Sequence, residues 1–230
     1  MTFDVRKLRL AFVATLILAM TGAFSAAFAQ APIQDKEYKL ITPAHAPQGK
    51  KIEVVEFFSY ACPHCAEFEA PLRAWLKNKP DDVEFKTVPL VFRENWKPLA
   101  KLYHTLDVMG FAEKLHSKVF QAIHGTEKLD LTDPDKILEW VGKQGIDKEK
   151  FKQTYNSFGM DAKVEASTKM GRDHGVMFTP AITINGKYLT GPSMAMGPDN
   201  HPSLQRLFQV VDALIAQERP KTAAASAKKK

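Results

Sequence analysis

The segment from residue 51 to about residue 92 constrains the fold more than any other part of the chain. Lys51–Phe58 is rich in β-branched and aromatic residues, which is typical of a buried strand. A helix with apolar residues at helical spacing follows, as far as about Lys79, and Val83–Phe92 is a second predicted strand. Because a helical crossover brings the chain back in the same direction, the segment predicts two parallel strands in an α/β fold.

Between about Asn95 and Ser167 the pattern changes to helices alone. Apolar residues three or four apart predict helices over Pro98–Val108, Ala112–Ile123, Asp133–Lys143 and Lys148–Phe158. Thr132 is the expected N-cap of the third of these helices. A further helix, over about Asp161–Asp173, leads back toward the sheet.

Strand composition returns near the C-terminus. Ala181–Ile184 and Lys187–Thr190 flank Asn185-Gly186, and this dipeptide favours the type I′ turn of a hairpin. A short edge strand over Glu37–Ile41 and a closing helix over about Pro202–Gln217 complete the elements. We therefore expect one α/β domain, built from residues 30–94 and 168–219, with an all-helical domain (residues 95–167) inserted into it.

The first 29 residues have the layout of a cleavable secretory signal peptide. Three basic residues precede an apolar run from Leu10 to Phe24, and Ala27-Phe28-Ala29 forms an A-x-A cleavage site. The apolar run is short for a membrane span, although an uncleaved anchor is the alternative. We expect an exported protein that begins at Gln30 after cleavage.

The formal net charge of the chain is +6. Much of this excess lies at the C-terminus, where residues 220–230 are rich in alanine and lysine and are expected to be a flexible tail. Nucleic-acid binding would need a basic face with interleaved aromatic residues, and the sequence shows none. We expect no nucleic-acid partner.

The chain has two cysteines, Cys62 and Cys65, and both lie in one Cys-Pro-His-Cys motif. A zinc site would need two further ligands, but the other histidines show no paired metal spacing. A purely structural bridge is a second alternative, although closing so short a loop removes little chain entropy. In an oxidising compartment the pair is better interpreted as a redox centre, with no metal and no cofactor beyond the Cys62–Cys65 disulfide.

The position of the motif suggests how its thiols differ. Cys62 comes at the start of a predicted helix, where unpaired N–H groups and the helix dipole favour a thiolate. Pro63 suits the first helical position, and His64 can supply a donor or a positive charge beside the sulfur. Cys65 lies one turn later on the same face. We expect Cys62 to attack and Cys65 to resolve the mixed disulfide.

Three further residues are candidates for the site. Glu56 lies inside an apolar strand, so its carboxyl is either at the solvent edge or buried beneath the cysteines. If it is buried, its pKa should rise and it could relay the proton of Cys65, with Lys86 as a candidate partner. Thr179-Pro180 precedes the hairpin strand, where proline is tolerated, but this position does not predict the proline's isomer.

Taken together, this order of elements resembles the thioredoxin fold, and it is closely similar to the DsbA family of bacterial periplasmic disulfide-introducing proteins. The resemblance covers the chain to about Gln217. Its residues are Glu56–Glu69 around the Cys-Pro-His-Cys motif, His174-Gly175-Val176, Thr179–Ile182 and Asn185–Tyr188.

The resemblance implies a thioredoxin-like fold, a central mixed sheet flanked by helices with an inserted all-helical domain. It also implies a strongly oxidising protein with a stabilised Cys62 thiolate, whose disulfide passes to exported proteins that are folding. Pro180 would be cis and lie against the cysteines, and the backbone beside Thr179 would pair with an extended substrate. The implied reoxidation partner is a DsbB-like, quinone-linked membrane protein. Family members usually have a hydrophobic residue where this chain has Thr179, and Met177-Phe178 look like extra residues, so substrate preference and redox tuning should differ.

Two other functions fit the same residues. A disulfide reductase or isomerase shares the chemistry, although isomerases of this compartment usually carry a separate dimerisation domain, for which no segment is available here. A peptide-binding chaperone would keep the motif as a fixed bridge and bind clients without its cysteines. We expect a periplasmic, monomeric oxidase.

Overall fold

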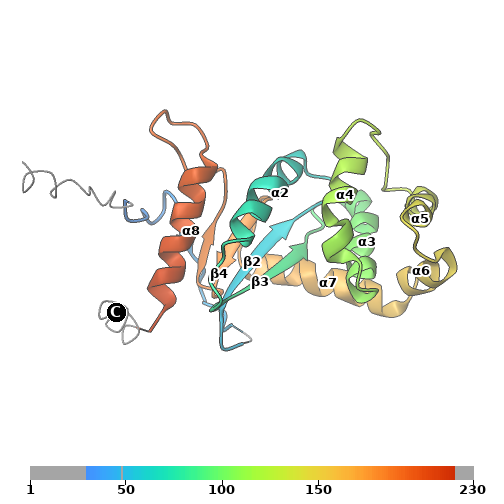
Figure 1. The fold of residues 1–230 in the computed structure, drawn as a ribbon. Helices are drawn as coiled ribbons and strands as arrows, with labels where there is room; N and C mark the ends of the chain where they lie inside the picture. The colour runs from blue at the N-terminus through green and yellow to red at the C-terminus, as the bar shows by residue number, and fades with distance from the viewer. Residues whose placement is uncertain (1–29, 48, 221–230) are drawn as a thin grey trace, which may run out of the picture. The chain divides into compact units, whose positions relative to one another are not determined.

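The computed structural model describes residues 30–47 and 49–220. The predicted signal peptide (residues 1–29) and the predicted tail from residue 221 onward lie outside the described residues. The described part contains a five-stranded sheet with helices on both faces and a further group of helices beyond one end of its central strands (Figure 1).

The sheet is mixed, as the sequence predicts. Its strands are β1 (Lys39–Leu40), β2 (Ile52–Phe58), β3 (Val83–Pro89), β4 (Ala181–Ile184) and β5 (Tyr188–Thr190). Their order across the sheet is β1-β5-β4-β2-β3. Strand β2 runs parallel to β3 on one side and antiparallel to β4 on the other. It therefore joins the parallel pair predicted around the crossover helix to the hairpin of β4 and β5. All seven residues of β2 are buried, which explains why five of them are apolar; the other two are Glu53 and Glu56.

The hairpin turn between β4 and β5 has the conformation that its sequence predicts. Asn185 and Gly186 both have positive φ, 49° and 58°, as a type I′ turn requires. A Cβ atom on Gly186 would lie 2.4 Å from the backbone oxygen of His45, so only glycine fits at this position.

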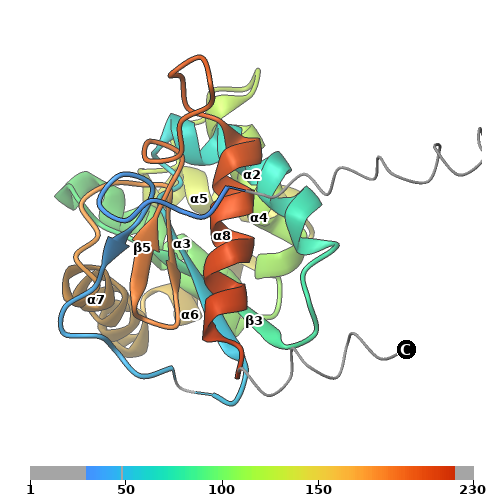
Figure 2. The ribbon, with the colours of Figure 1, turned by 90° about the vertical axis from the view of Figure 1, so that its left-hand side faces the viewer.

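Helices α2 (Pro63–Leu76) and α8 (Leu204–Glu218) cover one face of the sheet. Their apolar residues form one core with Val54 and Ile182, whereas Val55 and Phe57 point to the other face. Helix α7 (Phe158–Asp173) lies on that other side, and Figure 2 shows α7 and α8 with β5 between them. Alternate residues of β2 therefore belong to different cores.

The remaining helices are α3 (Lys97–Val108), α4 (Ala112–His124), α5 (Pro134–Lys143) and α6 (Lys148–Tyr155), and a 3₁₀ turn, Glu94–Trp96, precedes them. They share a core that extends to Phe58, Tyr60 and both cysteines. The expected N-cap of α5 is wrong, because the side chain of Asp133 caps this helix by accepting from the N–H of Asp135. Helix α7 continues across the expected boundary at residue 167, and the domain boundaries stay a prediction.

Candidate active site

The reactive motif lies where β2 ends and α2 begins. Cys62 is the N-cap residue of α2, with an extended backbone (φ −87°, ψ 117°), and Pro63 occupies the first turn of the helix. The backbone N–H of Cys62 donates to the Ser59 oxygen at 3.0 Å, which fixes the turn between strand and helix. The sulfur of Cys62 therefore lies beside the free N–H groups of the first helical turn.

The surroundings of Cys62 favour its thiolate. They lower the pKa of this thiol from 9.0 to about 5, and the largest cause is a hydrogen bond from the Cys65 side chain. Burial of Cys62 acts in the opposite direction, but a Thr179 side-chain hydrogen bond and the backbone N–H groups of Cys65 and His64 add to the lowering. Each of these donors stabilises negative charge on sulfur.

Cys65 has the opposite character. Its side chain is fully buried, and burial is the largest cause that raises the pKa of this thiol. The hydrogen bond to Cys62 and the negative charges of Cys62 and Glu56 raise the pKa further. Both cysteines are free thiols in this structure, so it represents the reduced form. At neutral pH this form carries one thiolate, at Cys62, and one thiol, at Cys65.

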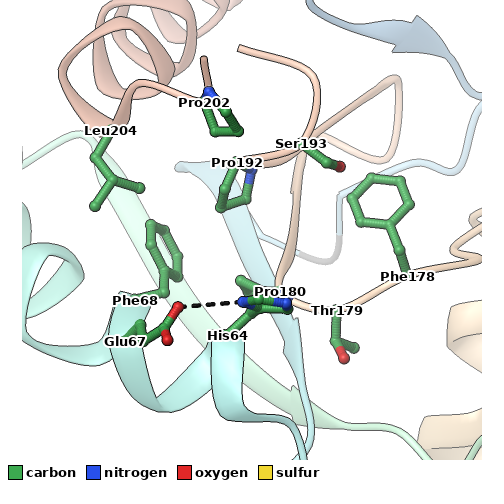
Figure 3. Close-up of a pocket in the computed structure, with 10 residues that line it drawn as sticks. All are labelled: His64, Glu67, Phe68, Phe178, Thr179, Pro180, Pro192, Ser193, Pro202 and Leu204. Carbon is green, nitrogen blue, oxygen red and sulfur yellow. Dashed lines mark hydrogen bonds and ion pairs between the residues drawn. The ribbon is translucent and has the colours of Figure 1, made fainter. Parts of the chain in front are cut away.

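The loop before β4 completes the site. The Thr179–Pro180 peptide bond is cis, as the resemblance implies, and the Cys62 thiol lies 3.4 Å from the backbone oxygen of Thr179. A groove of about 550 Å³ opens beside this loop. Figure 3 shows the residues that line it, among them His64, Phe68, Phe178, Pro192 and Leu204. A groove with apolar walls therefore adjoins the reactive sulfur.

The imidazole of His64 lies on the surface beside Glu67, and its predicted role beside the sulfur stays a prediction. Its side chain is 75% exposed, and Nδ1 lies 3.1 Å from a carboxylate oxygen of Glu67 (Figure 3). It is the backbone N–H of His64 that hydrogen-bonds to the Cys62 sulfur. The backbone at this position thus helps to stabilise the thiolate.

Glu56 is buried, so the structure decides between its two predicted environments. Its side chain is 1% exposed, and burial raises the pKa of its carboxyl to about 8, with a smaller contribution from the charge of Glu69. The charge on Glu56 in turn is one of the smaller causes that raise the pKa of Cys65. A carboxyl with this pKa can hold or release a proton near neutral pH.

The expected pairing of Lys86 with Glu56 is wrong. Lys86 donates to a carboxylate oxygen of Glu53 at 2.6 Å. The register pairs Val55 with Lys86, so Lys86 shares a sheet face with Val55 and Glu53, whereas Glu56 faces the opposite core. Side chains alternate between the faces of a sheet, and this alternation separates the two groups.

A buried polar cluster behind the cysteines was not predicted. Glu69 accepts hydrogen bonds from Arg73 Nε at 2.8 Å and from the Ser117 hydroxyl at 2.6 Å. The Tyr60 hydroxyl lies 2.8 Å from Nδ1 of His116, whose Nε2 is 3.5 Å from Glu69. The pair of Glu69 and Arg73 can be recognised from the sequence, because residues four apart are neighbours on a helix. The contacts that residues of α4 make with Glu69 cannot, because they depend on tertiary packing.

Neither a metal site nor a membrane span is evident in the part of the chain that the structure describes. No group of three or more histidine, cysteine, aspartate or glutamate side chains there could hold a metal ion. No helix within residues 30–47 and 49–220 is long and apolar enough to cross a membrane.

Comparison with known proteins agrees with this geometry. The family model described as "DSBA-like thioredoxin domain" matches residues 53–209. The chain belongs to the DsbA family. A Burkholderia cepacia DsbA, named a thiol:disulfide interchange protein, is 35% identical over 209 residues, which cover 90% of this chain and 95% of that protein.

Solved DsbA structures have the same fold. The crystal structure of Pseudomonas aeruginosa DsbA superposes with a TM-score of 0.75 at 34% identity, covering 86% of this chain and 97% of that one. The structure of the Xylella fastidiosa oxidoreductase DsbA gives 0.74 at 30% identity, covering 82% and 98%. The thioredoxin-like fold with a helical insertion is thereby confirmed, and this DsbA-family chain is a thiol:disulfide oxidoreductase.

Proposed function

We propose that this protein oxidises client proteins in the periplasm through a mixed disulfide at Cys62. The observation that supports this direction most strongly is the low pKa of Cys62, about 5, beside a buried Cys65 thiol. A stabilised thiolate favours the reduced form of the protein, and a stabilised reduced form makes its disulfide the stronger oxidant.

The reaction begins when a client thiolate attacks the sulfur of Cys62 in the Cys62–Cys65 disulfide. The bond between the two sulfurs breaks, and Cys65 leaves as a thiolate that takes up a proton. Glu56, with its raised pKa, is a candidate donor of that proton. The result is a disulfide between the client and Cys62.

A second client thiolate then attacks the client sulfur of the mixed disulfide. The client leaves with a new disulfide, having lost two electrons, and Cys62 leaves as a thiolate. Its low pKa makes it a good leaving group at this step. If the second client thiol is slow, Cys65 attacks Cys62 and releases the client unchanged, which is the resolving role we propose for Cys65.

We propose roles for the neighbouring residues and partners. Pro63 and the backbone of His64 shape the start of the helix, while Thr179 and Pro180 position an extended client segment beside Cys62. The clients are exported proteins with free cysteines, and a DsbB-like quinone-linked membrane protein restores the disulfide. We further propose that the protein works as a monomer and needs no cofactor. We also propose that residues 30–94 and 168–219 form the thioredoxin-like domain and that residues 95–167 form the inserted helical domain.

Oxidative refolding of a reduced client tests the proposal. The oxidised wild-type protein should restore client activity and Cys62→Ser should not. Cys65→Ser, supplied with its Cys62 as a mixed disulfide with glutathione, should exchange glutathione for the reduced client and accumulate a disulfide-linked complex with it. Refolding by the Cys62→Ser protein would refute the role of Cys62. Client binding that survives replacement of both cysteines, together with a disulfide that resists dithiols, would favour the chaperone alternative.

A further inference from the structure

A second groove, of about 760 Å³, meets the Cys-Pro-His-Cys motif from the side of α4. One wall consists of Pro63, Ala70 and Arg73 of α2 and of Lys77, the C-cap residue of this helix. Residues at the C-terminal end of α4 and just beyond it form the other wall. Glu67 lines both this groove and the apolar one of Figure 3. A client chain bound at Cys62 can therefore extend into either groove.

The groove carries an excess of positive charge away from the cysteines. Arg73 bonds to Glu69 through Nε at 2.8 Å, and its terminal nitrogens have no partner within residues 30–47 and 49–220. The ammonium of Lys77 likewise has no partner within these residues, and that of Lys128 bonds to the backbone oxygen of His124 at 2.9 Å.

The acidic residues of the groove do not offset these cations. Glu69 is 6% exposed, and its carboxylate already accepts from Arg73 and Ser117. Glu67 lies at the other end of the groove, where its carboxylate contacts His64 of the reactive motif. Lys77 and Lys128 are exposed, and neither has an ion-pair partner in the part of the chain that the structure describes.

The spacing along α2 indicates where a bound acid would lie. Arg73 lies ten positions after Pro63 in the helix, a rise of about 15 Å. An extended chain covers that distance in about five residues, at roughly 3.3 Å each. The two terminal nitrogens of Arg73 suit a carboxylate, which can accept from both.

We propose that this groove binds an acidic segment of the client, with an aspartate or glutamate about four to six residues from the reactive cysteine. The proposal rests on the proposed function and adds a sequence preference to it. Charge contacts at such an open site steer association and selectivity more than they add affinity.

Three reduced peptides test the preference, each with the same two cysteines and with Glu, Gln or Lys five residues from one of them. For each protein variant we measure the rate at which the oxidised protein transfers its disulfide to each peptide. The rates with the Glu and Lys peptides are each divided by the rate with the Gln peptide, which removes any general change in the variant's reactivity. The quantity compared between variants is the ratio of the Glu rate to the Lys rate. For the wild type at low salt we expect the Glu peptide to react about fivefold faster than the Lys peptide, since exposed charge pairs contribute modestly.

The double variant Lys77→Glu/Lys128→Glu should reduce this ratio to about one or below, and high salt should reduce it in the wild type, because salt screens exposed charges. The matched control Lys150→Glu/Lys152→Glu changes the net charge equally on the exposed surface of α6 and should keep the wild-type ratio.

Several results would overturn the proposal. One is a ratio that the groove variant leaves unchanged, and another is an equal change in the α6 control. If the membrane partner reoxidises the groove variant more slowly while the ratio of the Glu to the Lys peptide rate stays unchanged, the groove binds that partner and not a client. A wild-type protein that oxidises none of the peptides would refute the proposed function itself.

Discussion

The backbone oxygen of Thr179 lies 3.4 Å from the sulfur of Cys62, although 117 residues separate them in sequence. The side chain of the same residue also forms a hydrogen bond that lowers the pKa of Cys62. Thr179 thus contacts the reactive sulfur with its backbone and tunes the sulfur's charge with its hydroxyl.

Replacing Thr179 with valine should raise the pKa of Cys62 by about one unit, because a hydrogen bond to a charged group is lost. A less stabilised thiolate makes the disulfide a weaker oxidant, so the reduction potential should fall by about 30 mV. Equilibration with glutathione measures the potential. Thr42→Val is a matched control, since exposed Thr42 also precedes a cis proline and is not part of the site; an equal shift in both variants would contradict this account.

Glu56→Gln should stabilise the protein increasingly as pH rises from about 4.5 to 8. Because the carboxyl has a pKa of about 8 in the folded protein against 4.5 ordinarily, the folded protein binds more protons than the unfolded one in this range. Wild-type stability therefore falls as pH rises through this range, whereas glutamine does not titrate.

Urea unfolding at several pH values measures this effect, with both cysteines replaced by serine in wild type and variant to remove the thiol titrations. The exposed Glu127→Gln substitution is the control and should leave the pH dependence unchanged. If the free energy of unfolding depends on pH in the same way with Glu56→Gln as with Glu56 in the cysteine-free protein, the pKa of Glu56 is not raised.

Lys86→Met should leave the Cys62 pKa unchanged, because Lys86 bonds to Glu53 on the face of the sheet opposite Glu56. The change leaves the buried carboxylate of Glu53 without its cationic partner, so the free energy of unfolding should fall by about 1–3 kcal/mol. Thiolate absorbance and urea unfolding measure the two quantities. A clear shift in the Cys62 pKa would contradict this prediction and would favour a pairing of Lys86 with Glu56.

Gly191→Ala should disturb the loop that carries Pro180. A Cβ atom at Gly191 would lie 2.6 Å from a ring carbon of Phe178 and 2.9 Å from the Pro180 oxygen. We expect a loss of stability of about 1–3 kcal/mol, as for other overpacked sites, and slower client oxidation. Gly159→Ala, where the nearest atom is 3.9 Å away, is the control and should be tolerated; similar losses in both would point to a general backbone effect.

Local patterns in the sequence predict most of the fold. The apolar run of β2, the Asn185-Gly186 turn and the periodic helices all depend on neighbours close in sequence, and the structure confirms them. The start of α2 at the cysteine motif is predicted for the same reason. The N-cap of α5 differs by one residue, because Asp133 bonds to the Asp135 N–H while the Thr132 hydroxyl bonds to Asp130.

Pairings between elements are harder to predict. The partner of Lys86 depends on the register of β3 against β2, and a shift of one residue would move its side chain to the other face. The contacts of Glu69 with Ser117 and His116 join α2 to α4 and leave no local signal. The grooves likewise depend on how distant helices pack.

A pH titration of thiolate absorbance in the reduced protein measures the ionisation of Cys62 itself. We expect a first transition with a midpoint of about pH 5, from Cys62, and no second thiol ionising until far higher pH. Cys62→Ser should remove the first transition. A Cys62 midpoint near its ordinary value of 9.0 would contradict the claim that the fold stabilises this thiolate and thereby makes the disulfide a strong oxidant.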